Sequence, residues 1–191
     1  MQHVLGIDLF TGFRDADAIC LTTNGFIKRS GAAVMGAGVA RSALDYWPGI
    51  DYLVARSIGS GGCMPQVLTI KGDWDEPVLR VFPDKSYSVE WHIVTFPVKP
   101  NKVIVSEDKS NIIPRQRDRF EEGDECPGFW AMADLDIIEH SAKVLHHYAS
   151  LWSWEKVIIP APGTGNGGLT EAEVFARIGP ILDDRFWICT K

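Results

Sequence analysis

The chain has 191 residues, of which 46% are hydrophobic, and its formal net charge is −6. This is enough apolar chain for one sizeable core, and because no shift in composition marks a boundary, we expect a single domain over residues 1–191. The negative net charge argues against a protein that binds nucleic acid over its whole surface. No run approaches the roughly 18 apolar residues of a membrane span, and the first residues lack a signal-peptide pattern. A soluble, cytoplasmic protein with no membrane partner is therefore predicted.

Neither the cysteines nor the histidines have the spacing of a metal site. The cysteines are far apart, with no Cys-x-x-Cys pair: Cys20, Cys63, Cys126 and Cys189. Buried free thiols in a reducing compartment fit this pattern best. The histidines show no zinc spacing, and the adjacent His146 and His147 point to different faces of a helix. We therefore expect no metal and no cofactor.

Periodicity predicts strands and one helix in the first half of the chain. The predicted strands lie at residues 4–10, 18–21, 67–70, 78–82 and 91–96. A helix is predicted over residues 38–46, and Trp47, Pro48 and Gly49 end it. The middle of the chain is therefore rich in β structure.

A polar stretch at residues 98–129 contains Pro100, Pro114 and Pro127 and many charges. We interpret it as an exposed excursion, with an insertion at about residues 100–128 and one short strand at residues 102–105. A loop of this length is either a lid or disordered.

A long amphipathic helix is predicted over residues 130–152. Its apolar positions recur at steps of three and four residues: Leu135, Ile138, Ala142, Leu145 and Ala149. A strand at residues 156–159, a helix at 171–182 and a closing strand at 186–189 follow. Helices that alternate with apolar strands indicate a layered α/β fold, and the strand-rich middle predicts a mixed sheet.

Two glycine-bearing loops follow predicted strands, at residues 24–40 and 162–169. The second loop precedes Thr170-Glu171-Ala172-Glu173, which has the pattern of a capped helix start. Glycines let backbone N–H groups approach an anion closely, and a helix N-terminus adds partial positive charge. The two loops are therefore predicted to form the walls of one phosphate-lined cleft.

The second loop also suggests a nicotinamide-dependent enzyme. Gly163, Gly165 and Gly168 satisfy the spacing Gly-x-Gly-x-x-Gly, and Asp183 and Asp184 follow at the distance of a ribose-binding carboxylate. Only one helix and one strand come after this motif, whereas a dinucleotide-binding half needs two further strands. The dehydrogenase interpretation is therefore disfavoured.

Four segments, in the right order, resemble the macro domain, which is an ADP-ribose-binding module. Residues 17–24 are similar to its early strand, Asp-Ala-Ile-Val-Asn-Ala-Ala-Asn. Residues 34–40 are similar to its Met-Gly-x-Gly-Ile-Ala loop, and residues 160–169 to Gly-x-Gly-x-Gly-Gly-Leu. Residues 96–99 are similar to Phe-Pro-Thr-Lys, found in the branch with glycohydrolases that act on ADP-ribosylated DNA and glutamate.

This resemblance implies a three-layer α/β/α fold around a mixed sheet and a site for ADP-ribose. In the similar enzymes the lysine that matches Lys99 serves catalysis, and Asn24 would orient the distal ribose. Asp17 would accept the hydrogen of the adenine amino group, and the Phe186-Trp187 pair, by its position, would cover the adenine face. The other implied ligand-binding residues are Ala18, Val34, Met35, Gly36, Ala37, Gly38, Val39, Pro162, Gly163, Thr164, Gly165, Asn166, Gly167, Gly168 and Leu169.

The activity implied by the resemblance is that of an ADP-ribosyl glycohydrolase acting on ADP-ribosylated DNA or protein. Two alternatives stay open: a module that binds ADP-ribose without turnover, and a phosphatase acting on ADP-ribose 1″-phosphate. The chain departs from the family pattern at Ala37, where relatives often have lysine, and at Thr22 and Thr23, which replace small and amide residues. Gly167 stands where one glycohydrolase subgroup has a catalytic aspartate.

Overall fold

A mixed sheet forms the centre of this computed structural model, which describes residues 1–6, 8–72, 77–78 and 90–190. The strands are β1 (Gln2–Leu5), β2 (Ala18–Thr23), β3 (Gln66–Gly72), β4 (Pro77–Val78), β5 (Glu90–Pro97), β6 (Lys102–Ile104), β7 (Glu125–Pro127), β8 (Val157–Pro160) and β9 (Phe186–Thr190). The helices are α1 (Val39–Tyr46), α2 (Ile50–Gly61), α3 (Leu135–Leu151) and α4 (Glu171–Ile178). Two 3-10 helices, Pro114–Arg119 and Gly128–Trp130, complete the described elements.

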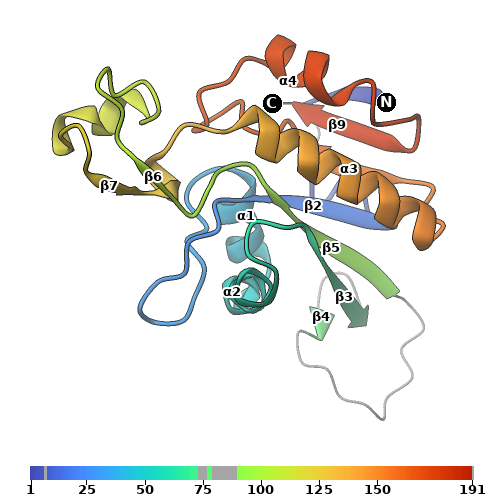
Figure 1. The fold of residues 1–191 in the computed structure, drawn as a ribbon. Helices are drawn as coiled ribbons and strands as arrows, with labels where there is room; N and C mark the ends of the chain where they lie inside the picture. Colours follow the sequence, from blue (N-terminus) through green and yellow to red (C-terminus); the bar gives the residue numbers. More distant parts are fainter. Residues whose placement is uncertain (7, 73–76, 79–89, 191) are drawn as a thin grey trace.

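The order of the strands places five of their ends at one edge of the sheet. The described strands of this sheet run in the order β1-β9-β8-β2-β5-β3-β4 (Figure 1). From β1 to β5 the neighbours are parallel, whereas β3 is antiparallel to both β5 and β4. The last residues of the five parallel strands are Leu5, Thr190, Pro160, Thr23 and Pro97. Open α/β sheets bind ligands at this carboxyl edge, so the loops that follow these residues are the place to look for a site.

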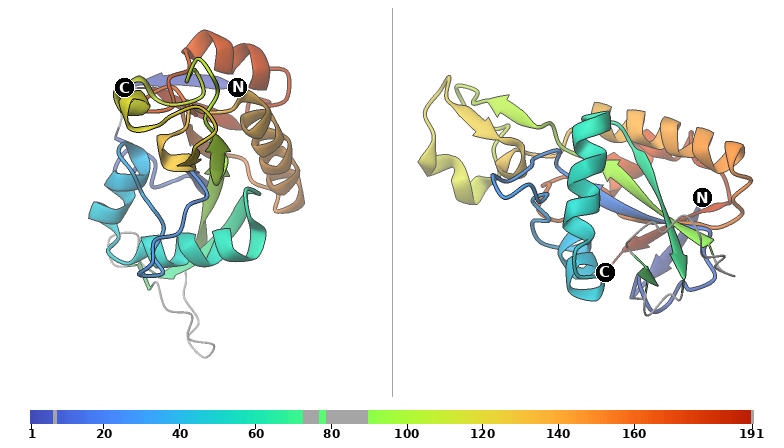
Figure 2. Two further views of the ribbon diagram at one scale, coloured as in Figure 1. Left: turned by 60° about the vertical axis from the view of Figure 1, so that its left-hand side comes forward. Right: turned by 90° about the horizontal axis from the view of Figure 1, so that it is seen from below.

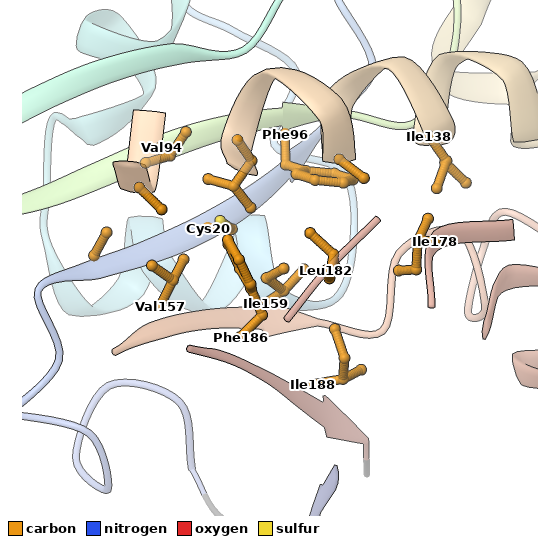
Figure 3. Packing of buried hydrophobic residues seen from close by; sticks show 14 of the residues in the cluster. Cys20, Val94, Phe96, Ile138, Val157, Ile159, Ile178, Leu182, Phe186 and Ile188 are labelled. Carbon is orange, nitrogen blue, oxygen red and sulfur yellow. The ribbon is translucent and has the colours of Figure 1, made fainter. Parts of the chain in front are cut away.

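Both faces of the sheet are covered, because successive side chains of β2 point into two different cores. Ile19 and Leu21 pack in a core with residues of α1 and α2, and Ala18 and Cys20 pack in a second core with residues of α3 and α4. Figure 2 shows the two helix pairs on opposite sides of the sheet, and Figure 3 shows Cys20 and Phe96 within the second core. The predicted three-layer α/β/α fold with a mixed sheet is confirmed.

Two predicted elements end earlier in the structure than the sequence indicated, and a third lies mostly outside the described residues. The strand expected at residues 4–10 ends at Leu5, since Asp8 then forms a turn by accepting hydrogen bonds from the amides of Phe10 and Thr11. The helix expected at residues 171–182 ends at Ile178. Of the strand expected at residues 78–82, Val78 belongs to β4 and the rest lies outside the described residues.

The start of α3 is set by a cap. Periodicity predicted this helix from residue 130, but it begins at Leu135. Asp134 has an extended backbone, and its Oδ1 accepts hydrogen bonds from the amides of Asp136 (2.8 Å) and Ile137 (3.2 Å). Because this cap satisfies two amides that have no partner inside the helix, it holds the first turn in place.

Helix α2 is an element that the sequence analysis missed. Trp47, Pro48 and Gly49 do end α1, as predicted, but Gly49 has a φ of 96° and is the N-cap of a second helix. The buried positions of α2 include Ile50, Val54 and Ile58, four residues apart on one helix face. This spacing is the signal that would have predicted α2.

The excursion at residues 98–129 is folded, so the expectation of a disordered loop is wrong. The predicted strand at residues 102–105 is β6, and it pairs with β7, which was not predicted. A small core lies within the insertion: Val105, Ile112 and Cys126 are buried, and Val103, Phe120 and Trp130 pack against them. In Figure 1, β6 and β7 project from one end of the main sheet. The insertion is therefore a small structural unit at the carboxyl edge.

Residues 1–6, 8–72, 77–78 and 90–190 contain neither a membrane-spanning helix nor a cluster of metal-binding side chains. None of the helices in these ranges is both long and apolar enough to pass through a membrane. Nor do three or more histidine, cysteine, aspartate or glutamate side chains gather there as ligands of a metal ion would. The four cysteines are free, and Cys20 and Cys126 are buried.

Candidate functional site

A cleft of about 920 Å³ lies at the carboxyl edge of the parallel strands. Thr23, Pro160 and Thr190, at the ends of β2, β8 and β9, form part of its wall. Loops that follow β2, β5 and β8 form more of the wall, and the insertion contributes another part. Pockets for small ligands usually have volumes of about 300–1,000 Å³, so the cleft has the size for a nucleotide-like ligand.

The cleft brings the two predicted glycine loops together. The residues of the first loop that line it are Asn24, Met35, Gly36, Ala37, Gly38 and Val39. Those of the second loop are Gly163, Thr164, Gly165, Asn166, Gly167 and Leu169. Val34, Pro162 and Gly168 belong to the same loops without lining the cleft. Two segments from opposite ends of the chain thus share one cavity.

Both loops that line the cleft contain main-chain N–H groups without a main-chain acceptor among the described residues. The amides of residues 35–38 and 164–167 donate no hydrogen bond to the main chain of another described residue. Helix α1 begins at the cleft, and its N-cap Gly38 offers no side-chain acceptor, so the amides of the first helical turn stay available as well. Partial positive charge at this helix N-terminus favours a negatively charged ligand.

The helix after the second loop contributes less than expected. Thr170 caps α4 by accepting a hydrogen bond from the Glu173 amide, and the Glu173 carboxylate accepts one from the Thr170 amide. This capping box was predicted from the sequence, and it already satisfies amides at the start of α4. Anion binding by the second loop therefore depends on the loop amides.

The glycines of the cleft are needed for two different reasons. A Cβ on Gly36, Gly38 or Gly165 would project into open space, with no atom within 4 Å. Gly36 and Gly38 have φ values of 62° and 90°, a backbone conformation that glycine adopts without strain. A Cβ on Gly167 would lie 2.3 Å from the carbonyl oxygen of Gly163, so glycine is required there for packing within the loop.

Asn24 lies in the cleft, but part of its side chain holds the first loop in shape. Its Nδ2 donates a hydrogen bond to the carbonyl oxygen of Val34 (2.8 Å), and its Oδ1 accepts one from the amide of Phe26 (3.1 Å). A primary amide has two N–H donors and two acceptor lone pairs. One donor and one lone pair of Asn24 therefore remain for a ligand.

Lys99 follows the end of β5, lines the cleft and is only 6% exposed. Its Nζ donates hydrogen bonds to the carbonyl oxygens of Ala131 (2.7 Å) and Asn166 (2.9 Å). Burial, together with the nearby cation of Arg115, lowers the pKa of Lys99 to about 8. The ammonium form therefore still prevails at pH 7, but it gives up a proton more readily than an exposed lysine does.

Three of the predicted ligand-binding residues lie away from the cleft: Asp17, Ala18 and Trp187. They stand at the amino ends of β2 and β9, which is the opposite edge of the sheet. The Oδ2 of Asp17 accepts hydrogen bonds from the amides of Glu155 (2.7 Å) and Lys156 (2.9 Å), so this carboxylate ties β2 to the segment before β8. Ala18 is buried in the core, and the Lys156 ammonium lies 4.9 Å from the ring centroid of Trp187.

Asp8 is a carboxylate at the carboxyl edge that the sequence analysis did not select, although it is not among the residues that line the cleft. It follows β1, and the amide of Gly6 donates a hydrogen bond to the oxygen of Thr190, which lines the cleft. The Oδ1 of Asp8 accepts hydrogen bonds from Phe10 and Thr11, whereas its Oδ2 accepts none from a described residue. Asp8 fell inside the strand expected at residues 4–10, and only the end of β1 at Leu5 places it after a strand, so the sequence did not mark it.

Two threonine hydroxyls were also missed. Thr23 and Thr190 both line the cleft and are more than nine-tenths buried. Within the described part of the chain, neither Oγ1 has a hydrogen-bond partner. A buried hydroxyl without a partner is costly, which makes both groups candidates for contact with a ligand.

The insertion and the residues directly after it place three more residues along the cleft: Arg115, Phe129 and Trp130. Arg115 belongs to the 3-10 helix Pro114–Arg119, and its Nη2 donates a hydrogen bond to the Oδ1 of Asn166 (3.0 Å). These residues escaped the sequence analysis because the stretch was interpreted as an exposed excursion. No local pattern shows that it folds back toward the second glycine loop.

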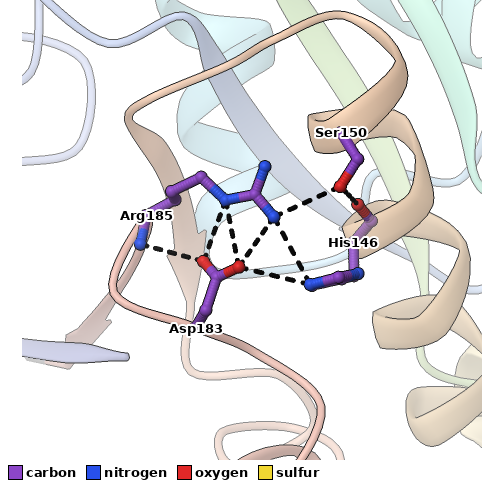
Figure 4. Close-up of polar contacts among 4 residues, drawn as sticks. All are labelled: His146, Ser150, Asp183 and Arg185. Carbon is purple, nitrogen blue, oxygen red and sulfur yellow. Dashed lines mark hydrogen bonds and ion pairs between the residues drawn. The ribbon is translucent and has the colours of Figure 1, made fainter.

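Asp183, the carboxylate that a dinucleotide site would need, has a different role. Figure 4 shows it between Arg185 and His146, which lie 2.7 Å and 3.2 Å from its Oδ2. Hydrogen bonding from Arg185 lowers the pKa of Asp183 to about 2. None of these residues lines the cleft, and the contact joins the start of β9 to α3. The structure thus offers no support for a ribose-binding role of Asp183.

The fold is similar to that of solved macrodomains. The macrodomain of Thermus aquaticus DarG is similar to this chain with a TM-score of 0.60 and 18% identity, over 100% of this chain and 97% of that one. The macrodomain of Mycobacterium tuberculosis DarG gives a TM-score of 0.57 and 19% identity, over 100% and 98% of the two chains.

A third similar structure is Thermosipho africanus DarTG in complex with ADP-ribose, with a TM-score of 0.61 and 16% identity over 98% of this chain. This chain spans 41% of the length of that one. No protein-family model matches the sequence, and no curated protein matches it. The predicted resemblance to macrodomains is therefore confirmed at the level of the fold.

Proposed function

We propose that the cleft binds ADP-ribose and that the protein hydrolyses an ADP-ribosyl linkage on DNA or protein. The observation that carries this proposal is that both glycine loops line one cavity, while the amides of residues 35–38 and 164–167 have no main-chain acceptor among the described residues. A diphosphate is an anion of the right shape for two such loops, and each charge-assisted hydrogen bond contributes about 1.5–3 kcal/mol. The complex of the similar Thermosipho africanus DarTG with ADP-ribose supports the choice of ligand.

The order of the strands suggests the direction in which the nucleotide lies. Asp8 follows β1 and Thr190 ends β9, whereas Lys99 follows β5 at the other end of the parallel strands. The glycine loop after β8 lies between these ends. We place the diphosphate at the glycine loops, the adenosine near Asp8 and Thr190, and the distal ribose near Asn24 and Lys99. In this arrangement Asp8, and not Asp17, accepts the hydrogen bond from the adenine amino group.

Lys99 is the residue on which the proposed hydrolysis depends. Cleavage transfers the bonding electron pair from the distal ribose to the departing group, and water then adds to the anomeric carbon and releases a proton. The Lys99 ammonium stabilises the charge that grows on the departing group or donates a proton to it. Its low exposure strengthens this interaction, because little water screens it.

Calorimetry with ADP-ribose and a substrate panel test the two parts of the proposal. The panel consists of DNA with ADP-ribosylated thymidine, ADP-ribosylated protein and ADP-ribose 1″-phosphate. We expect binding of ADP-ribose, and release from DNA or protein that slows about 100-fold or more in Lys99→Met. Lys28→Met, at an exposed residue of the first loop, is the control for loss of one positive charge.

The outcomes separate the alternatives. Binding without release would leave a reader module, in which the Lys99 ammonium only holds the carbonyl groups of Ala131 and Asn166 together. Release of phosphate alone would identify the phosphatase. The absence of binding would remove the ADP-ribose assignment altogether.

A further inference from the structure

The insertion holds Arg115 in a defined position beside Lys99. The amide of Ile113 donates a hydrogen bond to the oxygen of Trp130 (2.9 Å), and the amide of Met132 donates one to the oxygen of Asn111 (2.8 Å). These bonds pair residues 111–113 with residues 130–132. The first segment leads directly into the 3-10 helix that carries Arg115, and the second contains Ala131, whose oxygen accepts a hydrogen bond from Lys99.

Asn166 is the point at which the two cations meet. Lys99 donates to its main-chain oxygen (2.9 Å), and Arg115 donates to its side-chain Oδ1 (3.0 Å). Both cations thus contact the same residue of the second glycine loop. The pKa of Lys99 is lowered first by burial and then by Arg115, which agrees with their proximity.

Neither cation has a carboxylate partner within the described residues. The exposed arginine Arg41, by contrast, pairs with Asp45 at 2.9 Å. Glu171 is the acidic residue that lines the cleft, and no ion pair of the described residues joins it to either cation. Arg115 is exposed, and a hydrogen bond of this kind adds about 1 kcal/mol or less to stability, so a ligand can replace the contact with Asn166 at little cost. The positive charge is available for an anion.

We propose that Arg115 is a specificity residue that binds an anionic group attached to the anomeric carbon of the distal ribose. This inference rests on the proposed function, in which the distal ribose lies near Lys99. Because Arg115 and Lys99 share Asn166, Arg115 is at the same end of the cleft. The planar guanidinium suits a phosphate, which stays negatively charged when it is attached to the anomeric carbon and can accept two parallel hydrogen bonds.

Two nucleotides that differ only in this group provide the test: ADP-ribose and ADP-ribose 1″-phosphate. Their dissociation constants are measured by calorimetry with the wild-type protein, Arg115→Ala, Arg115→Lys and Arg119→Ala. If the protein hydrolyses the phosphorylated nucleotide, kcat/KM replaces its dissociation constant. Arg119→Ala is the matched control, because it removes the same charge from the same 3-10 helix, and Arg119 lies over the Trp130 ring instead of reaching Asn166.

We expect Arg115→Ala to weaken binding of ADP-ribose 1″-phosphate about tenfold or more, with less than about threefold change for ADP-ribose. Arg115→Lys is expected to restore part of the loss, and Arg119→Ala to change neither constant. Equal losses for both nucleotides would place Arg115 at the diphosphate and overturn the proposal. Unchanged constants would overturn it too, since Arg115 would then only support the loop. If the wild-type protein binds neither nucleotide, the ADP-ribose assignment fails first and this inference with it.

Discussion

The Nζ of Lys99 donates a hydrogen bond to the main-chain oxygen of Asn166 across 2.9 Å, although the two residues are 67 positions apart. This bond joins the end of β5 to the middle of the second glycine loop. Lys99 is therefore both the proposed catalytic group and a link between two walls of the cleft. Experiments on Lys99 have to separate these two roles. A change of pH titrates the ammonium group without removing the side chain, whereas a substitution changes both roles together.

The first prediction concerns that pH dependence. The pKa of Lys99 is lowered to about 8, so its ammonium form is lost as the pH rises through this value. If the ammonium assists the departing group, the rate of hydrolysis stays level below about pH 7 and falls about tenfold per unit well above pH 8. Initial rates between pH 6 and about pH 10 measure this, with a substrate that is stable over the range.

Two variants check the assignment of this titration. Lys99→Arg keeps a positive charge at every pH of the series, so its remaining activity should show no fall near pH 8. Arg115→Ala removes a neighbouring cation and should move the fall to higher pH, because the ammonium form of Lys99 is then less disfavoured. A rate that rises through pH 8 would mean that the neutral amine is the active form.

The second prediction tests the space that glycine leaves in the cleft. Gly165→Glu adds a side chain that projects into open space, together with a negative charge close to the proposed diphosphate. We expect the affinity for ADP-ribose to fall about 100-fold, while the melting temperature changes little, since no packed atom is displaced. Calorimetry and thermal unfolding measure the two effects.

Gly59→Glu is the control for the second prediction. Gly59 is an exposed residue of α2, and a Cβ added there would meet one atom at 4.0 Å, so the same charge is added away from the cleft. Its affinity for ADP-ribose should equal that of the wild-type protein. A loss of affinity in both variants would mean that net charge, and not occupation of the cleft, is responsible.

Much of the fold was predictable because apolar runs report burial directly. The run at residues 157–159 is fully buried in the centre of the sheet as β8, and the stripe of Ile138, Ala142, Leu145 and Ala149 is the buried side of α3. The glycine loops were predictable for a related reason, since a loop after a parallel strand always lies at the carboxyl edge. These features depend on short stretches of chain.

Features that depend on the assembled sheet were harder to predict. Asp17 and Asn24 flank the same strand of six residues, β2, which spans about 20 Å at 3.3 Å per residue, so they stand at opposite edges of the sheet. The cleft lies at the edge of Asn24, and Asp17 is not among its lining residues. The position of Arg115 was not available from the sequence, because it follows from the small core of the insertion and from strands of three residues each.

The third prediction separates the two aspartates. Asp17→Ala leaves the amides of Glu155 and Lys156 without their acceptor and should lower the free energy of unfolding by about 1–3 kcal/mol. Its affinity for ADP-ribose should stay within about twofold of the wild-type value, because Asp17 lies at the amino edge. Asp8→Asn should weaken ADP-ribose binding about tenfold, with a smaller effect on unfolding than Asp17→Ala, since the amide oxygen can still cap the turn.

Denaturant unfolding and calorimetry on both aspartate variants give the answer. A loss of nucleotide affinity in Asp17→Ala alone would restore the original sequence-based assignment. A loss in Asp8→Asn alone would support the nucleotide direction proposed here. If neither variant loses affinity, the adenosine end of the ligand lies elsewhere along the cleft.

The fourth prediction addresses the insertion as a structural unit. Ile112 is fully buried in the small core, and it forms a β-bridge with Ala131, which accepts the hydrogen bond from Lys99. Ile112→Ala should destabilise this unit by about 2–5 kcal/mol, the usual cost of such a cavity. Because the main sheet has separate cores, we expect the insertion to open locally before the rest of the protein unfolds.

Hydrogen exchange resolved by segment measures this local opening. In Ile112→Ala, the amides of residues 103–130 should exchange faster, while those of α3 and β8 keep their wild-type protection. Turnover should fall along with this protection, because the oxygen of Ala131 and the guanidinium of Arg115 both lose their fixed positions around Lys99. Uniformly faster exchange over the whole chain would instead show that the insertion and the sheet unfold as one unit. A fall in turnover would then reflect the loss of the whole fold and not the displaced position of Arg115.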